Sequence, residues 1–267
     1  MRFKNLEFTN AAGQRLSARI DLPTEEKPRA YALFAHCFTC SKNIKAISHI
    51  SRALTREGIA VLRFDFTGLG ESEGDFADTN FSSNVDDLVM AADFMKENFE
   101  APKVLIGHSL GGAAVLQAAA KIPSAVAVIT IAAPADPVHV SRALGESKEM
   151  IEGRGEADVE LAGRTFKIKK QFLDDLAAVR MQETIRNLNR ALLIFHSPYD
   201  SIVGIENAAK IFQTARHPKS FISLDKADHL LMDKKDSLYV GAIIATWVLK
   251  YIESDIGAEH GDVDKNF

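Results

Sequence analysis

The sequence has only two cysteines, one tryptophan and no excess of basic residues. Two cysteines cannot build a disulfide-rich scaffold or complete a four-ligand zinc site. The formal net charge is −4, and no dense cluster of lysine or arginine indicates nucleic acid as a partner. The most apolar stretch, residues 125–133, is too short to cross a bilayer. We therefore expect no metal, cofactor, nucleic acid or membrane among the partners of this chain.

Length and composition predict one large globular domain. The chain has 267 residues, of which 46% are hydrophobic and 25% are charged, as is ordinary for such a domain. Residues 1–7 lack the apolar core of a signal peptide, which favours a cytoplasmic location. Composition leaves the oligomeric state open.

Strand-like and helix-like segments alternate from about residue 30, which is typical of a mostly parallel sheet covered by helices on both faces. Before them, residues 2–9 and 16–21 alternate in polarity and predict an antiparallel hairpin at the sheet edge. The further strands are expected at residues 29–36, 59–64, 103–106, 125–132, 191–196 and 220–224. The further helices are expected at residues 41–57, 84–99, 205–214 and 237–251, with another after residue 109.

The segment from about residue 136 to 189 interrupts this rhythm. It contains charged helical sequence and then an alternating stretch around Ala162-Gly163, which predicts a β-hairpin outside the main sheet. We interpret it as a small cap inserted into a domain that spans residues 1–253. Residues 254–267 are polar and are expected to form a mobile tail.

The motif Gly107-His108-Ser109-Leu110-Gly111 lies between an apolar strand and an alanine-rich helix. A strand, Gly-x-Ser-x-Gly and a helix together form the nucleophile elbow of the α/β-hydrolase fold. The sharp turn places the serine in a strained conformation, and side chains at the two flanking glycine positions would collide with their neighbours. Ser109 is therefore the candidate nucleophile.

A serine nucleophile needs an imidazole to accept its proton and a carboxylate to orient that imidazole. In this fold the chain order is serine, acid, histidine. Asp200 follows the penultimate strand and His229 follows the last strand, so both lie at the same sheet edge as Ser109. Asp136 is an alternative acid, whereas Asp228 is too close in sequence to His229 to orient it.

The other histidines fit structural roles better. His36 and His196 end strands and are expected to hydrogen-bond backbone near the site, and His108 is expected to point away from the reacting edge. The glycine-rich turn at residues 65–72 does not match a phosphate-binding spacing, so we interpret it as structural.

Two backbone amides are expected to form the oxyanion hole. The first is Leu110 N–H, which lies at a helix N-terminus. The second comes from the loop after residue 36, and by position it is Phe38 N–H. Cys37 stands where glycine is common, which makes this second donor the less secure of the two.

Cys37 and Cys40 are spaced as Cys-x-x-Cys and leave two readings open. One is a redox pair acting as a thiol accessory; the other is two reduced cysteines in a strand-to-helix loop. A thioredoxin-type pair needs its second cysteine inside a helix, whereas Ser41 here has the character of a helix cap.

Three longer segments carry a resemblance to a known family. Residues 36–42 (HCFTCSK), 63–72 (RFDFTGLGES) and 107–112 (GHSLGG) resemble a bacterial subgroup of the α/β-hydrolases, which is often fused to a C-terminal OsmC-like peroxide-reducing domain. The resemblance extends over residues 1 to about 253. Because this chain ends after the closing helix, we expect no OsmC function from it.

The resemblance implies acyl hydrolysis of the esterase type. Together with the motifs, it predicts a serine esterase that hydrolyses small carboxylic esters through an acyl-Ser109 intermediate. A peptidase or a thioesterase would use the same Ser109, Asp200 and His229 and remains an alternative.

Overall fold

An eight-stranded sheet forms the centre of the molecule in the computed structural model, which describes residues 2–24, 27–37, 39–161 and 163–259, with backbone alone for 142–143 and 254–259. The strand order is β1-β2-β4-β3-β5-β6-β9-β10. The strands are β1 (Arg2–Thr9), β2 (Arg15–Leu22), β3 (Ala30–Ala35), β4 (Ile59–Phe64), β5 (Val104–His108), β6 (Ala127–Ile131), β9 (Ala191–His196) and β10 (Lys219–Ser223).

The pairing pattern separates the N-terminal hairpin from the rest of the sheet. β1 and β2 pair antiparallel, β2 joins β4 antiparallel, and β4, β3, β5, β6, β9 and β10 pair in parallel. The central strands β3, β4, β5, β6 and β9 are buried along their whole length, and they are mostly apolar because helices cover both of their faces. Parallel strands end at one edge, so the loops after β3, β5, β9 and β10 lie on the same side of the molecule.

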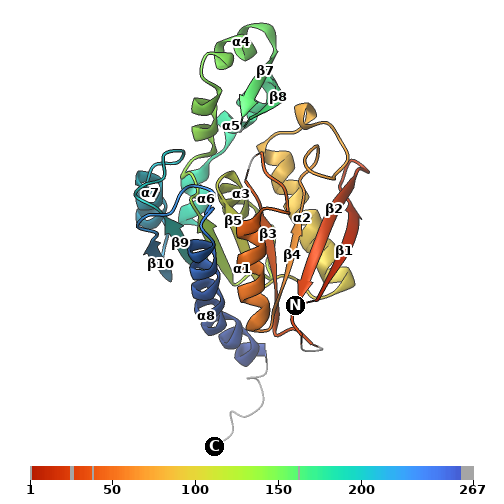
Figure 1. The fold of residues 1–267 in the computed structure, drawn as a ribbon, viewed down its shortest axis with the longest axis vertical. Helices are drawn as coiled ribbons and strands as arrows, with labels where there is room; N and C mark the ends of the chain where they lie inside the picture. The colour runs from red at the N-terminus through yellow and green to blue at the C-terminus, as the bar shows by residue number, and fades with distance from the viewer. Residues whose placement is uncertain (1, 25–26, 38, 162, 260–267) are drawn as a thin grey trace, which may run out of the picture.

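Helices cover both faces of the sheet (Figure 1). On one face, α1 (Lys45–Arg56) and α8 (Lys234–Glu259) pack together over an apolar cluster that includes Ile50 and Val248. On the other face lie α2 (Phe81–Asn98), α3 (Leu110–Ala118) and α7 (Glu206–Thr214). This arrangement confirms the predicted α/β fold with its parallel sheet and edge hairpin.

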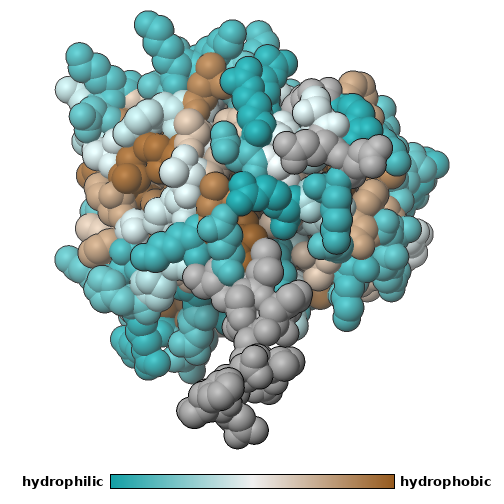
Figure 2. Space-filling model, turned by 90° about the horizontal axis from the view of Figure 1, so that it is seen from below, coloured by the Kyte–Doolittle hydropathy of each residue, from teal (hydrophilic) through white to brown (hydrophobic). Residues whose placement is uncertain are grey.

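Between β6 and β9 the chain leaves the sheet and forms an insertion that we call the cap. It consists of η2 (Pro137–Leu144), α4 (Ser147–Arg154), β7 (Glu156–Leu161), β8 (Arg164–Lys169), α5 (Lys170–Ala178) and α6 (Met181–Arg186). α4, β7 and β8 form the lobe at the top of Figure 1, and α6 lies against α3. β7 and β8 form a separate antiparallel hairpin, as the alternating sequence predicts. The cap lies at the end of the molecule where the parallel strands have their carboxyl ends. The surface at the opposite end of the molecule is mostly hydrophilic, with separate small apolar patches (Figure 2).

Several helix boundaries differ from the sequence predictions. α1 begins at Lys45, four residues after the expected start, and α2 begins at Phe81, three residues before it. The early start of α2 has a local cause, because Asn80 and Ser83 form a capping box in which each side chain accepts the other residue's backbone N–H. α8 continues to Glu259, so the predicted tail from residue 254 begins within a helix; residues 260–267 lie outside the described part of the chain.

Candidate active site

Ser109 occupies the sharp turn between β5 and α3. Its backbone has φ 56° and ψ −126°, a left-handed conformation that is unfavourable for a residue other than glycine. Ser109 N–H donates to Ile131 O at 2.8 Å, which ties the turn to the neighbouring strand. A Cβ on Gly107 would lie 2.2 Å from Gly111 O, and one on Gly111 would lie 2.4 Å from His36 O. Both glycine positions of the motif therefore require the absence of a side chain.

Ser109, His229 and Asp200 form a chain of hydrogen bonds. His229 Nε2 lies 3.0 Å from Ser109 Oγ, and His229 Nδ1 lies 2.8 Å from Asp200 Oδ2. Because a carboxylate accepts and cannot donate, Nδ1 carries the proton and Nε2 is free to accept one from the serine. The three residues are largely buried: the His229 side chain is 10% exposed and that of Asp200 is 1% exposed.

The Asp200 carboxylate is held from three sides. Burial alone would raise its pKa, but hydrogen bonds from His229 and from the N–H groups of Val203 and Ile202 outweigh burial and lower the pKa below its ordinary value. His196 supports this loop because its Nε2 donates to Val203 O at 2.7 Å. Asp200 therefore faces His229 as an anion.

The competing candidates have other partners. Asp136 accepts from Val138 N–H, and Asp228 accepts from Leu230 N–H within its own turn. His36 Nδ1 lies 2.7 Å from Cys37 O, so His36, like His196, contacts backbone beside the site, as expected from the sequence. Burial lowers the pKa of both His36 and His196.

The contacts of His108 differ from the sequence expectation. Its Nε2 lies 2.6 Å from His229 O, and the two imidazole rings are 5.1 Å apart. The His108 side chain therefore turns toward the loop between β10 and α8 that carries His229 (residues 224–233, which we call the histidine loop) instead of away from the site. The elbow motif carries no information on this contact, because the histidine loop is 121 positions further along the chain.

One of the two expected oxyanion donors is described. Leu110 is the first residue of α3, so its N–H has no acceptor within the helix and lies at the positive end of the helix dipole. The other expected donor, Phe38, lies outside the described residues. The carbonyls of Ala35 and His36 pack directly against Gly111, which brings the start of that loop to the N-terminus of α3.

A buried ionic network holds the far end of the same loop. Lys42 Nζ donates to Asp65 Oδ2 at 2.7 Å and also to Glu71, while Lys42 N–H donates to Asp65 Oδ1 at 2.6 Å. Arg63 donates to Lys42 O and to Asp21 Oδ2. These contacts confirm a structural role for the turn at residues 65–72, since a Cβ on Gly70 (φ +58°) would collide with the Asp65 carboxylate. Sequence reasoning missed the network, although Arg63 is conspicuous in an otherwise apolar strand.

Cys37 and Cys40 are joined in a disulfide. Their Cα atoms are 5.2 Å apart, because Cys40 N–H closes a turn onto Cys37 O at 3.1 Å, and this separation lies in the range for disulfides. The structure therefore contains the oxidised pair rather than two reduced cysteines. A redox role for the pair stays a prediction.

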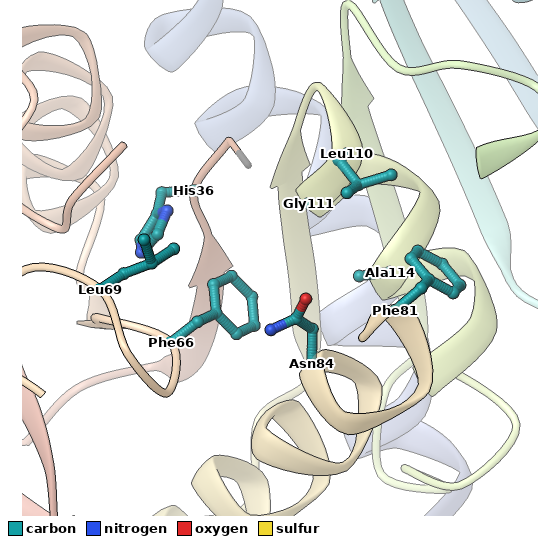
Figure 3. A pocket seen from close by; sticks show the side chains of 8 residues that line it. All are labelled: His36, Phe66, Leu69, Phe81, Asn84, Leu110, Gly111 and Ala114. Carbon is teal, nitrogen blue, oxygen red and sulfur yellow. The ribbon is translucent and has the colours of Figure 1, made fainter. Parts of the chain in front are cut away.

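A small cavity of about 10 Å³ lies beside Leu110, room for about one water molecule (Figure 3). Its walls are mostly apolar, and the amide of Asn84 points toward the ring of Phe66 across it. The lining residues come from the loop after β3, the turn after β4, α2 and α3: His36, Phe66, Leu69, Phe81, Asn84, Leu110, Gly111 and Ala114.

The described residues form neither a metal-binding cluster nor a membrane-spanning helix. Within residues 2–24, 27–37, 39–161 and 163–259, no group of three or more His, Cys, Asp or Glu side chains is arranged to hold a metal ion. Over the same part of the chain, no helix has the length and apolar character needed to span a bilayer.

A parallel sheet of this strand order, with a Gly-x-Ser-x-Gly elbow hydrogen-bonded to histidine and aspartate from later loops, defines an α/β-hydrolase. Comparisons with known proteins agree. Residues 26–152 match the family model described as Hydrolase_4, serine aminopeptidase S33. The esterase domain of a Rhodothermus marinus protein is 53% identical, with a TM-score of 0.78, over 94% of this chain and all of that chain. The chain belongs to the α/β-hydrolase superfamily.

More distant relatives share the fold. Est1E from Butyrivibrio proteoclasticus, solved with ferulic acid, has a TM-score of 0.81 at 21% identity over 93% of this chain and 99% of that chain. The mouse mitochondrial palmitoyl-protein thioesterase ABHD10 is 28% identical over 186 residues, 67% of this chain. The match spans 62% of the length of that thioesterase.

Proposed function

We propose that the protein is a serine esterase in which Ser109 attacks the carbonyl carbon of a carboxylic ester. The observation that carries this proposal is the relay of two hydrogen bonds, 3.0 Å from Ser109 Oγ to His229 Nε2 and 2.8 Å from His229 Nδ1 to Asp200. His229 Nε2 accepts the hydroxyl proton as the new C–O bond forms. Asp200 holds the imidazole in the required tautomer and stabilises its charged form.

The oxyanion of the tetrahedral intermediate is stabilised at the N-terminus of α3. Leu110 N–H supplies one donor there, and Phe38 N–H is the proposed second donor from the loop after β3. One such donor contributes about 3 kcal/mol to lowering the barrier. Collapse of the intermediate expels the alcohol, which takes its proton from His229. Water then attacks the acyl-Ser109 ester with His229 as general base, and the carboxylic acid leaves.

The cavity beside Leu110, which Phe66 and Phe81 help to line, has a volume of about 10 Å³ and so offers no space for a long acyl chain. The cap stands over the same side of the sheet, so we propose that it controls which esters reach Ser109.

Turnover of p-nitrophenyl acetate tests this proposal. Ser109→Ala should abolish turnover while the far-ultraviolet circular dichroism spectrum stays that of the wild type. Ser124→Ala is the matched control, because Ser124 Oγ donates to Pro102 O, before β5 begins, and takes no part in the relay. Undiminished turnover by Ser109→Ala would refute the assignment. A series of p-nitrophenyl esters from acetate to decanoate then measures the acyl-chain preference.

A thioesterase is the second candidate, and the similarity to the mouse palmitoyl-protein thioesterase ABHD10 favours it. The same relay attacks a thioester carbonyl, and the leaving group is then a thiol. Parallel assays with acyl-CoA thioesters, oxygen esters and peptide anilides separate the three hydrolase classes by their kcat/KM values. A higher kcat/KM for thioesters than for oxygen esters of equal chain length would favour this second candidate.

A further inference from the structure

His108 contacts the main chain of the residue proposed as the general base. Its Nε2 lies 2.6 Å from His229 O. A carbonyl oxygen only accepts hydrogen bonds, so the proton of His108 is on Nε2 and this nitrogen is the donor. The imidazole immediately before the nucleophile is thereby joined to the loop that carries the base.

The surroundings of His108 keep it an uncharged donor. It borders a small apolar cavity between α1, the sheet and the histidine loop, lined otherwise by Phe34, Ile44, Ala46, Ile47, Ile50, Ile131, Leu230 and Leu231. Burial, and after it the nearby His229, lower the pKa of His108 to about 4, although the bond to His229 O opposes the shift. The other titratable groups that face it are Asp200 and His36. Near neutral pH, His108 therefore adds no positive charge beside His229.

The histidine loop is otherwise held by its own turn. The Asp228 carboxylate accepts the N–H groups of Leu230 and Met232, and Leu231 N–H donates to Asp228 O. Leu231 is buried in a left-handed conformation with φ 53°, which packing must stabilise. These contacts shape the turn, whereas the bond from His108 ties it to the strand that leads into Ser109.

We propose that His108 is a positioning residue that fixes the peptide group of His229 and thereby keeps His229 Nε2 within hydrogen-bonding distance of Ser109 Oγ. This inference rests on the proposed serine esterase function. Asp200 fixes the imidazole from its Nδ1 side, and His108 fixes the backbone from which that imidazole extends. The imidazole of His108 is hydrogen-bonded to His229 O and not to the Ser109 hydroxyl. Loss of this imidazole therefore displaces the base without removing any group that touches the substrate.

Two variants of nearly equal size isolate the hydrogen bond. His108→Gln keeps an N–H donor at a position near that of Nε2, whereas His108→Met fills similar space without a donor. We expect His108→Met to lower kcat for p-nitrophenyl acetate about 10- to 100-fold, the effect of a displacement of about 1 Å at a reacting group, with KM changed less than about twofold. His108→Gln should recover most of the lost kcat.

His49→Met is the control, since His49 forms a comparable bond from α1 to Ser237 Oγ, at 2.8 Å, in a different part of the molecule. It should keep the wild-type kcat. The inference is overturned if His108→Met retains the wild-type kcat, or if His108→Gln and His108→Met lose it equally, because packing alone would then account for His108. The Ser109→Ala variant separates failure of the proposed function from failure of this inference. If Ser109→Ala stays active, the proposed function fails. If Ser109→Ala is inactive and His108→Met keeps the wild-type kcat, only the positioning role of His108 fails.

Discussion

Ion pairs differ in burial between two regions of the molecule. They are buried beside the loop after β3, which leads to the proposed oxyanion site, and they are exposed in the cap. At the loop after β3, Arg63 forms an ion pair with Asp21, and Lys42 forms one with Asp65. All four side chains are at most 4% exposed. In the cap, Lys169 pairs with Asp78 across the lobe boundary, with the two side chains 37% and 66% exposed. Buried pairs are costly to break because the remaining charge cannot reach water, whereas exposed pairs are screened and contribute little.

The difference indicates which part of the molecule needs accurately positioned residues. Buried pairs hold Lys42, at the far end of the loop that carries the proposed second oxyanion donor. The cap is attached by apolar side chains that join the core cluster of α2 and α3, among them Phe166 edge-on to Phe76, by Asp175 accepting from Ser82 at the start of α2, and by exposed charges. We therefore expect changes in the sheet to alter stability and kcat, and changes in the cap to alter substrate choice and local mobility.

The largest effect is expected from breaking the buried pair. Arg63→Met removes one arginine partner from the buried Asp21 carboxylate, which keeps Arg19, and it also leaves Lys42 O without its Arg63 donor. The free energy of unfolding should therefore fall by about 3–5 kcal/mol. Urea denaturation measures this change. Arg15→Met is the matched control, because Arg15 pairs with Glu73 at the surface and its loss should cost about 0–1 kcal/mol. Equal losses in the two variants would contradict the comparison.

The next largest effect should be confined to the cap. Phe166→Ala removes the buried ring that packs on Phe76, a substitution that costs about 3 kcal/mol in a well-packed site. Hydrogen exchange measured by mass spectrometry should become faster in β7 and β8 and stay unchanged in β3 and β5. Faster exchange throughout the sheet would show that the cap is not an independent unit of stability.

Acid should weaken the sheet through its buried histidines. The ordinary pKa of 6.5 for His108 falls to about 4 in the folded protein, so between these values the unfolded chain binds a proton that the folded chain does not. The free energy of unfolding should therefore fall as pH falls from about 6.5 to 4, with about 3 kcal/mol due to His108. In His108→Gln, urea denaturation across this range should show a shallower slope. An unchanged slope would contradict the buried, neutral state of His108.

The smallest effect is expected at the exposed pair between the lobes. Lys169→Met should leave the free energy of unfolding unchanged within error and the kcat for p-nitrophenyl acetate intact, since the pair is screened by water and salt. Raising the salt concentration should have as little effect on the wild type. A large loss of stability in this variant would mean that exposed charges hold the cap after all.

Periodicity and motif placement were sufficient to predict the strand and helix order, because a buried parallel strand and an elbow leave strong local signals. The approach of Asp200 and His229 to Ser109 also follows from such signals, since strand ends of a parallel sheet share one edge. Local sequence was less informative where a boundary depends on side-chain capping, as at Asn80 and Ser83.

Contacts between distant segments left no local signal. Two hydrogen bonds each join a side chain to a backbone carbonyl on another segment: His108 donates to His229 O, and Arg63 donates to Lys42 O. Any residue can present a carbonyl, so no residue type marks the acceptor. The pairing of Cys37 with Cys40 was open for another reason: the spacing allows both a disulfide and two free thiols, and no other residue type in the segment decides between them.

Covalent labelling by a fluorophosphonate tests the central claim most directly, because the reagent reacts with a serine only when a base activates it. Intact-mass spectrometry of the wild type should show one adduct per chain, and peptide mapping should place it on Ser109. His229→Gln should slow the labelling strongly. An adduct on another residue, or undiminished labelling of His229→Gln, would contradict the proposal that His229 makes Ser109 a nucleophile.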